Sequence, residues 1–235
     1  MWLRRPAYHS RNEVERGSSA CAGAIEWNYD RAEVIADILI HAVGVTSGLI
    51  AATALVAMAT VYVHGAGAVS VGVYSICLET MLVLSATYNL WPISPAKWLL
   101  RRFDHSAIYA LIAATYTPLI TELGAGTFEM VLLVGLWSIA AVGVSLKLAL
   151  PGRFDRLSIA IYLVMGWSGL LLYHTLLAGA PVLTVRLVLT GGLLYTAGVP
   201  FHIWQRLRFQ NAIWHCFVLL AAACHCAAIF VLQTS

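Results

Sequence analysis

Charged residues are scarce in this chain of 235 residues, of which Asp, Glu, Lys and Arg make up 11%. Ordinary soluble domains carry about a quarter charged residues. With 60% hydrophobic residues and a mean hydropathy of +0.81, a soluble fold would have more apolar surface than its core could enclose. The scarcity of charge therefore excludes an ordinary soluble domain.

The sequence also lacks the alternation of apolar and polar residues that marks the strands of a membrane barrel. Its apolar runs are continuous and about 20 residues long, the length a helix needs to cross about 30 Å of hydrocarbon. Seven segments of this kind are predicted, at 34–60, 69–91, 105–123, 128–149, 157–178, 182–204 and 212–232. The predicted fold is an all-α bundle of seven transmembrane helices.

Residues 1–31 lack an apolar core segment, so we predict a flexible cytoplasmic N-terminal tail without a signal peptide. The membrane domain is predicted to be 32–235, without an internal repeat. Pro118 and Pro200 lie within apolar segments and are expected to kink them. The five cysteines lack metal-binding spacing and are interpreted as small buried hydrophobes; they are Cys21, Cys77, Cys216, Cys224 and Cys226.

Basic residues are nearly absent from one side of the predicted topology, where only Arg186 lies. The other thirteen are Arg4, Arg5, Arg11, Arg16, Arg31, Lys97, Arg101, Arg102, Lys147, Arg153, Arg156, Arg206 and Arg208. Because cytoplasmic loops carry an excess of Lys and Arg, the N-terminus is predicted to be cytoplasmic and the C-terminus outside. The net charge of +3 is thus a topology signal and does not indicate nucleic-acid binding.

Ionisable residues inside a bilayer are costly, so each is a functional candidate. Glu33, Asp37 and His41 are spaced four apart, and at 100° per residue they lie within an arc of about 80°. They form a polar stripe that enters from the cytoplasmic side. Three other predicted helices carry polar residues at similar depth: Ser85 and Asn89, Asp104 and His105, and Asn211 and His215.

Each of these residues alone could be a helix cap or a headgroup contact, as Asp104 would be at the start of its predicted helix. Together they favour one shared site at the cytoplasmic helix ends. Glu79 and His225 lie about 15 Å deeper by helical rise, near the bilayer midplane. Two alternatives stay open for them: Glu79 pairs with His225 or is held protonated by desolvation, or the two are separate, locally satisfied residues.

Several segments carry a family resemblance: EVIADILIH (33–41), SATYN (85–89), FDHSAIY (103–109), ATYTP (114–118), MGW (165–167), GGLLY (191–195) and IWHCFV (213–218). In their order and spacing the chain resembles the bacterial hemolysin III proteins, and through them the progestin and adiponectin Q receptor superfamily. The resemblance covers 29–232 and implies a seven-helix bundle. It also implies a multi-pass protein of the bacterial inner membrane, with membrane lipids as partners.

The resemblance implies a zinc site near the cytoplasmic helix ends, held by three histidines. A Ser-x-x-x-His motif maps onto Ser85 and Asn89, and a His-x-x-x-His motif maps onto Asn211 and His215. An Asp that acts through a bound water maps onto Asp104. Two of the three imidazole positions are therefore Asn in this chain.

A zinc site needs at least three good protein ligands, and an Asn carboxamide is a weak donor to zinc. Zinc is thus a possible cofactor, but tight binding is not expected at the mapped positions. Asp37 stands where the family usually has Asn. The alternative is a site rebuilt with substitute ligands from Asp37, His41, Asp104 and His105.

Three functions are compatible with these residues. The first is a membrane protein of lipid homeostasis that keeps a polar pocket at the family's zinc position. The second is a ceramidase-like zinc hydrolase of lipid amides, with Asp104 as base, His215 as ligand and Ser85 as oxyanion donor. The third is a pore, against which the clustering of charge at one membrane face argues.

Overall fold

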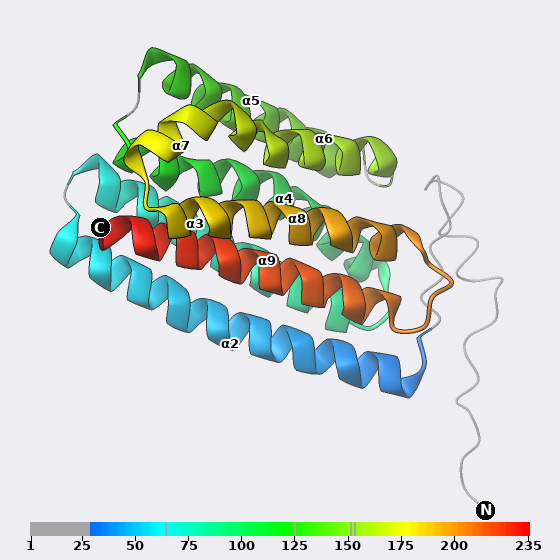
Figure 1. The fold of residues 1–235 in the computed structure, drawn as a ribbon. Helices are drawn as coiled ribbons and strands as arrows, with labels where there is room; N and C mark the ends of the chain where they lie inside the picture. Colours follow the sequence, from blue (N-terminus) through cyan, green and yellow to red (C-terminus); the bar gives the residue numbers. More distant parts are fainter. Residues whose placement is uncertain (1–28, 64, 125, 151, 153) are drawn as a thin grey trace, which may run out of the picture.

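The computed structural model describes residues 29–63, 65–124, 126–150, 152 and 154–235, and the regular structure within them is helical. The helices are α2 (Arg31–Tyr62), α3 (Ala66–Leu90), α4 (Pro95–Glu122), α5 (Thr127–Ala149), α6 (Asp155–Trp167), the 3-10 helix η1 (Ser168–Leu172), α7 (Tyr173–Gly179), α8 (Val182–Ile203) and α9 (Gln210–Gln233). Because α6, η1 and α7 follow one another in one rod, the described helices form a bundle of seven rods (Figure 1). The predicted tail and Cys21 lie almost wholly outside the described residues.

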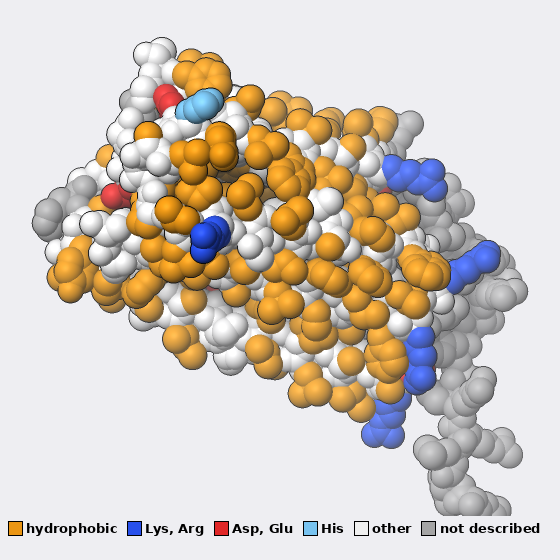
Figure 2. Space-filling view, in the orientation of Figure 1, with side chains coloured by type: hydrophobic (Ala, Val, Ile, Leu, Met, Phe, Trp, Pro, Cys, Tyr) orange, Lys and Arg blue, Asp and Glu red, His pale blue; other side chains and the backbone are white. Residues whose placement is uncertain are grey.

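Six of these rods are long and apolar enough to cross a membrane, and α4 is the exception. It packs against α3, α5, α6 and α9, so its neighbours enclose much of its surface and it can carry more polar residues. On the face shown in Figure 2, apolar side chains cover the sides of the bundle. Most of the visible Lys and Arg side chains gather at the end where α2 begins. The all-helical membrane fold is thus confirmed.

The start of α4 differs from the prediction by ten residues. The helix begins at Pro95, at its first position, where a missing N–H costs nothing and φ is already helical. Lys97 and Arg101 therefore belong to the helix, where both are buried. Asp104 lies more than two turns inside α4, so its interpretation as an N-cap was wrong.

The predicted continuous segment 157–178 is interrupted by η1. In an α-helix the Gly169 N–H would bond to the carbonyl of Met165. Here it donates to the Tyr116 hydroxyl at 2.7 Å, and that hydroxyl lies 3.0 Å from the Met165 carbonyl and 2.5 Å from that of Gly166. The Tyr116 hydroxyl of α4 thus forms hydrogen bonds with backbone groups at the point where η1 interrupts the α-helix. Pro118, by contrast, lies inside an α-helix.

Close packing joins the rods elsewhere. A Cβ added to Gly143 of α5 would lie 2.6 Å from the ring of Tyr109, so the two helices approach as closely as glycine allows. The four described cysteines form no disulfide, and only Cys226 is buried. The prediction of buried cysteines is therefore wrong for Cys216, which is exposed on the apolar surface of α9.

Candidate functional site

The first turn of α2 is tied to the start of α9. Asp30 caps α2 by accepting from the Ala32 and Glu33 N–H groups, and Glu33 Oε2 accepts in return from the Asp30 N–H at 2.8 Å. Glu33 Oε1 accepts from the Phe209 N–H at 2.8 Å. Both oxygens of Glu33 are thus used by backbone donors. The predicted stripe residue therefore holds two helix ends together.

The Asp30 carboxylate also binds Arg208, whose Nη2 lies 2.9 Å from Oδ2. The Glu33 backbone N–H, together with this guanidinium, lowers the pKa of Asp30 below its usual value. A carboxylate at a helix N-terminus is further favoured by the helix dipole. The contact between α2 and the α8–α9 turn is therefore strongest with Asp30 ionised.

Asp37 is the centre of the polar cluster, a name we use for Asp37, His41, Ser85, Asn89, Asn211 and His215. Its Oδ2 accepts from Asn211 Nδ2 at 2.6 Å, and its Oδ1 lies 3.1 Å from His215 Nδ1. The same Oδ1 lies 3.7 Å from His41 Nδ1. Asp37 is 8% exposed, so one buried carboxylate orients three side chains.

The two histidines of the cluster have defined tautomers. His41 Nδ1 lies 2.8 Å from the Asp37 backbone oxygen, which only accepts, so Nδ1 carries the proton. His215 Nδ1 carries its proton for the same reason, since it faces the Asp37 carboxylate. Both Nε2 atoms therefore keep a lone pair when the rings are neutral. The rings lie edge to face, with centroids 4.4 Å apart.

Hydrogen-bond donors face both of these lone pairs. His41 Nε2 lies 3.4 Å from Ser85 Oγ, and His215 Nε2 lies 3.4 Å from Asn89 Nδ2. Asn89 Oδ1 in turn accepts from Asn211 Nδ2 at 3.0 Å. The two Asn residues at the mapped imidazole positions thus take part in the cluster as hydrogen-bonding amides.

Asp104 and His105 extend in another direction. The Asp104 carboxylate lies 3.4 Å from His105 Nδ1 and lines the same cavity as Ser85. His105 Nδ1 donates to the Arg101 carbonyl at 2.9 Å, and its ring packs edge to face on Tyr88. Of the substitute ligands considered, the structure brings Asp37 and His41 to His215 and leaves Asp104 and His105 outside that group.

The residues present do not reproduce a three-histidine zinc site, because Asn89 and Asn211 direct N–H groups into it. Ligand atoms of Asp37, His41 and His215 nevertheless lie within 4.8 Å of one another. Two imidazoles and a carboxylate are the donor types of many catalytic metal sites. A metal held by all three residues would take the place of the Nδ1 protons, because the Nδ1 atoms are the ring nitrogens that lie beside the Asp37 carboxylate.

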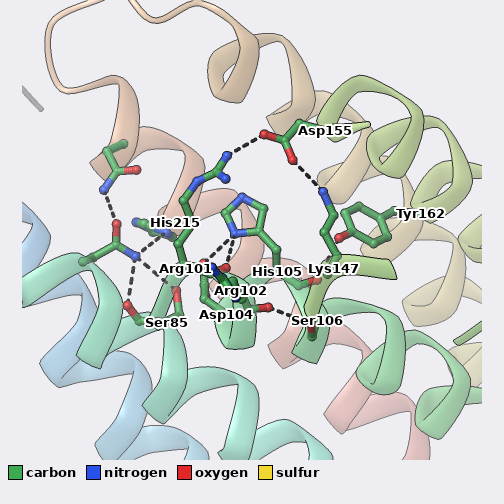
Figure 3. A network of polar contacts seen from close by, with 12 residues as sticks. Ser85, Arg101, Arg102, Asp104, His105, Ser106, Lys147, Asp155, Tyr162 and His215 are labelled. Atoms are coloured by element: carbon green, nitrogen blue, oxygen red, sulfur yellow. Dashed lines mark hydrogen bonds and ion pairs between the residues drawn. The ribbon is translucent and has the colours of Figure 1, made fainter. Parts of the chain in front are cut away.

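A second polar network lies beside the cluster (Figure 3). Arg101 Nη2 and Lys147 Nζ each lie 2.6 Å from a different oxygen of Asp155. The side chains of the two cations are 9% and 5% exposed. In the sequence, Arg101 and Lys147 indicate only topology, and nothing singles out Asp155. Spacing within one helix does not reveal that α4, α5 and α6 are joined through the Asp155 carboxylate.

A cavity of about 1100 Å³ opens inside the bundle between α4, the α6–η1–α7 rod, α8 and α9. Ser85, Asn89, Asp104, Asn211 and His215 line it at the end where α2 begins. Its wall is otherwise largely apolar, with Ile108, Leu111, Leu163, Leu172, Leu189 and Val218 among its lining. Charged side chains line it as well, among them Arg101, Asp155, Arg156 and Arg206, so four residues of the polar cluster are reached from a space with both apolar and charged walls.

The two deep candidates do not pair. His225 Nε2 donates to the Val188 carbonyl at 3.2 Å, and its ring lies near Tyr195. Glu79 Oε2 is buried without a hydrogen-bond partner and faces the position of Gly48 on α2. The expected pair is thus not found, and only His225 is locally satisfied. That Glu79 is held protonated by desolvation stays a prediction.

Comparison with known proteins identifies the family. The family model described as "Haemolysin-III related" matches residues 31–226. A "Hemolysin-3 homolog" of Bacillus subtilis (strain 168) is 36% identical over 81% of this chain and 90% of its own length. "Hemolysin-3" of Bacillus cereus is 31% identical over 86% of this chain and 94% of its own length.

A more distant similarity reaches the "Monocyte to macrophage differentiation factor" of Homo sapiens, 28% identical over 67% of this chain and 68% of that protein. No solved structure matches the chain. The apolar helices make it a multi-pass membrane protein, and its bacterial relatives point to the cell membrane. With the family model covering most of its length, the chain belongs to the hemolysin III family.

Proposed function

We propose that this protein binds a membrane lipid inside its helix bundle and acts in membrane-lipid homeostasis through the polar cluster. The observation that carries the proposal is the cavity, which is lined by many apolar side chains and also by Ser85, Asn89 and His215. Known small-molecule pockets are typically about 300–1,000 Å³ and mostly apolar, with a few convergent polar groups. A space of this size and lining suits a lipid whose acyl chain lies in the cavity and whose polar headgroup contacts the cluster.

We infer seven crossings, with the N-terminus in the cytoplasm of a bacterial cell and the membrane domain at 32–235. Figure 1 supports an odd number of crossings, because α2 begins at one end of the bundle and the chain ends at the other. The gathering of basic side chains where α2 begins supports a cytoplasmic N-terminus. In this orientation the polar cluster works from the cytoplasmic side of the inner membrane.

The proposal is tested by native mass spectrometry of the protein purified in a mild detergent. We expect about one retained acyl lipid per chain. Gly192→Phe introduces a ring at a residue that lines the cavity and should reduce retained lipid at least about fivefold. Gly72→Phe is the control, since open space surrounds the position of its Cβ. A wild-type protein free of lipid, or equal lipid in both variants, would refute the proposal.

Metal-dependent hydrolysis of a lipid amide is the second candidate function, favoured by the group Asp37, His41 and His215. A bound metal would polarise the scissile carbonyl and activate a water. The three side chains would hold it, and Ser85 and Asn89 would contact the substrate from the cavity. Metal analysis of the purified protein tests this candidate, and a content far below one ion per chain would refute it. The pore stays a prediction that conductance in planar bilayers would test.

A further inference from the structure

Ser85, His41 and Asp37 form a chain of contacts that the lipid-binding role alone does not require. Ser85 Oγ faces His41 Nε2 at 3.4 Å, and His41 Nδ1 is fixed by Asp37 through its backbone oxygen at 2.8 Å. The Asp37 carboxylate lies 3.7 Å from the same nitrogen. The lone pair of His41 is therefore directed at a serine hydroxyl, with a carboxylate behind the ring.

A nucleophilic serine needs this combination: a hydroxyl, a base within reach of its proton, and a third group that orients the base. The separation of 3.4 Å is long for an O–H···N hydrogen bond. Catalytic hydrogen bonds in unliganded sites are often long and shorten only in the complex with substrate. The contact therefore has the geometry expected of a site without its substrate.

Asn89 adds a donor beside the nucleophile. Its Nδ2 donates to the Ser85 carbonyl at 2.9 Å and lies 3.4 Å from Ser85 Oγ. The negative charge of a tetrahedral intermediate develops on the former carbonyl oxygen of the substrate, so a donor stabilises it only by turning towards that oxygen. The Ser85 carbonyl accepts one N–H of Asn89 at 2.9 Å, and the other N–H has only two contacts of 3.4 Å, so it is the one that a substrate oxygen in the cavity would take.

The reacting oxygen is also accessible to a lipid. Ser85 and Asn89 both line the cavity, whereas Asp37 and His41 lie behind them and outside its lining. The base and its orienting carboxylate are 6% and 8% exposed as whole residues, so they are shielded from bulk water. An acyl chain in the cavity would bring its carbonyl to Ser85.

We propose that Ser85 is the nucleophile of a metal-independent acyl hydrolase that cleaves ester bonds of membrane lipids. Ser85 Oγ bonds to the acyl carbon as His41 Nε2 accepts the hydroxyl proton, and Asp37 stabilises the resulting imidazolium. The acyl–oxygen bond then breaks, and His41 returns the proton to the departing alcohol. A water attacks the acyl-serine in the same way, which releases the fatty acid and restores Ser85. This inference rests on the proposed binding of a lipid in the cavity.

The test uses the full-length protein in nanodiscs and a fluorophosphonate probe, whose phosphorus bonds to an activated serine as fluoride leaves. We expect labelling at Ser85, located by peptide mass spectrometry, and unchanged in the presence of EDTA. Ser85→Ala should abolish labelling, and His41→Gln should slow it at least about a hundredfold. Ser106→Ala is the matched control, because this buried serine only donates to the Arg102 carbonyl and should leave labelling intact.

Lipid retention is measured on the same samples, so the two proposals can fail separately. Equal labelling of wild type and Ser85→Ala, or no labelling of a wild type that retains lipid, overturns the serine mechanism and leaves lipid binding in place. Loss of labelling with EDTA overturns it in favour of a metal. Wild-type protein that neither retains lipid nor reacts overturns both. Variants enter the comparison only if their lipid retention matches wild type, which separates lost chemistry from misfolding.

Discussion

The ion triad of Arg101, Asp155 and Lys147 allows a quantitative test of how this end of the bundle is held together. Asp155→Asn keeps the shape of the side chain and leaves two buried cations without their anion. Breaking a buried ion pair by removing one partner costs about 3–5 kcal/mol. The Asp155 side chain is 35% exposed, so water screens part of this loss, and we expect about 2–3 kcal/mol.

Thermal unfolding in detergent measures the effect, which should lower Tm by about 5–10 °C in a chain of this length. Adding Lys147→Met to Asp155→Asn should recover part of the loss, because it removes one of the two unpaired cations. A Tm for Asp155→Asn within about 1 °C of wild type would refute the reasoning. A further decrease in Tm on adding Lys147→Met would also refute it.

Three other predictions follow from local features. The double variant Asn89→His with Asn211→His should gain about one zinc ion per chain by metal analysis, and no gain would show that the cluster cannot be converted to imidazole ligands. The pKa of Asp30 is lowered in the folded state, so its ionised carboxylate stabilises the fold fully above the usual Asp pKa. This stabilisation is lost as pH falls through the lowered pKa. The Tm difference between wild type and Asp30→Asn should therefore shrink towards pH 3, and a constant difference would contradict this. Gly143→Ala should destabilise by about 1–3 kcal/mol through its clash with a tyrosine ring, whereas Gly72→Ala should not, and equal effects in denaturation would refute the packing argument.

Much of the fold could be predicted because membrane helices are recognised by length and apolar composition alone. Six predicted segments agree closely with helices or rods, and their ends differ by a few residues. The start of α4 could not be predicted in this way, since Lys97 and Arg101 are charged and still helical. Their charges are satisfied by contacts from other elements: two carbonyls at the end of α3 for Lys97 and the Asp155 carboxylate for Arg101.

The candidate site shows the same division between local and tertiary information. Spacing of four residues correctly placed Asp37 and His41 on one face of α2, because side-chain direction in a helix is set by sequence position. Which residues they meet depends on how α2 lies against α3 and α9. The contacts of Asp37 with His215 and of His41 with Ser85 therefore depend on helix packing. No periodicity within one helix reveals them.

The contacts of Asp30 and Glu33 with Arg208 and Phe209 have a mechanical consequence. They connect the first turn of α2 directly to the start of α9, and His215 lies about two turns further along that helix. A displacement of the first turn of α2 would therefore act directly on the start of α9. The two helices that supply Asp37 and His215 are thus coupled at their ends as well as through the cluster itself.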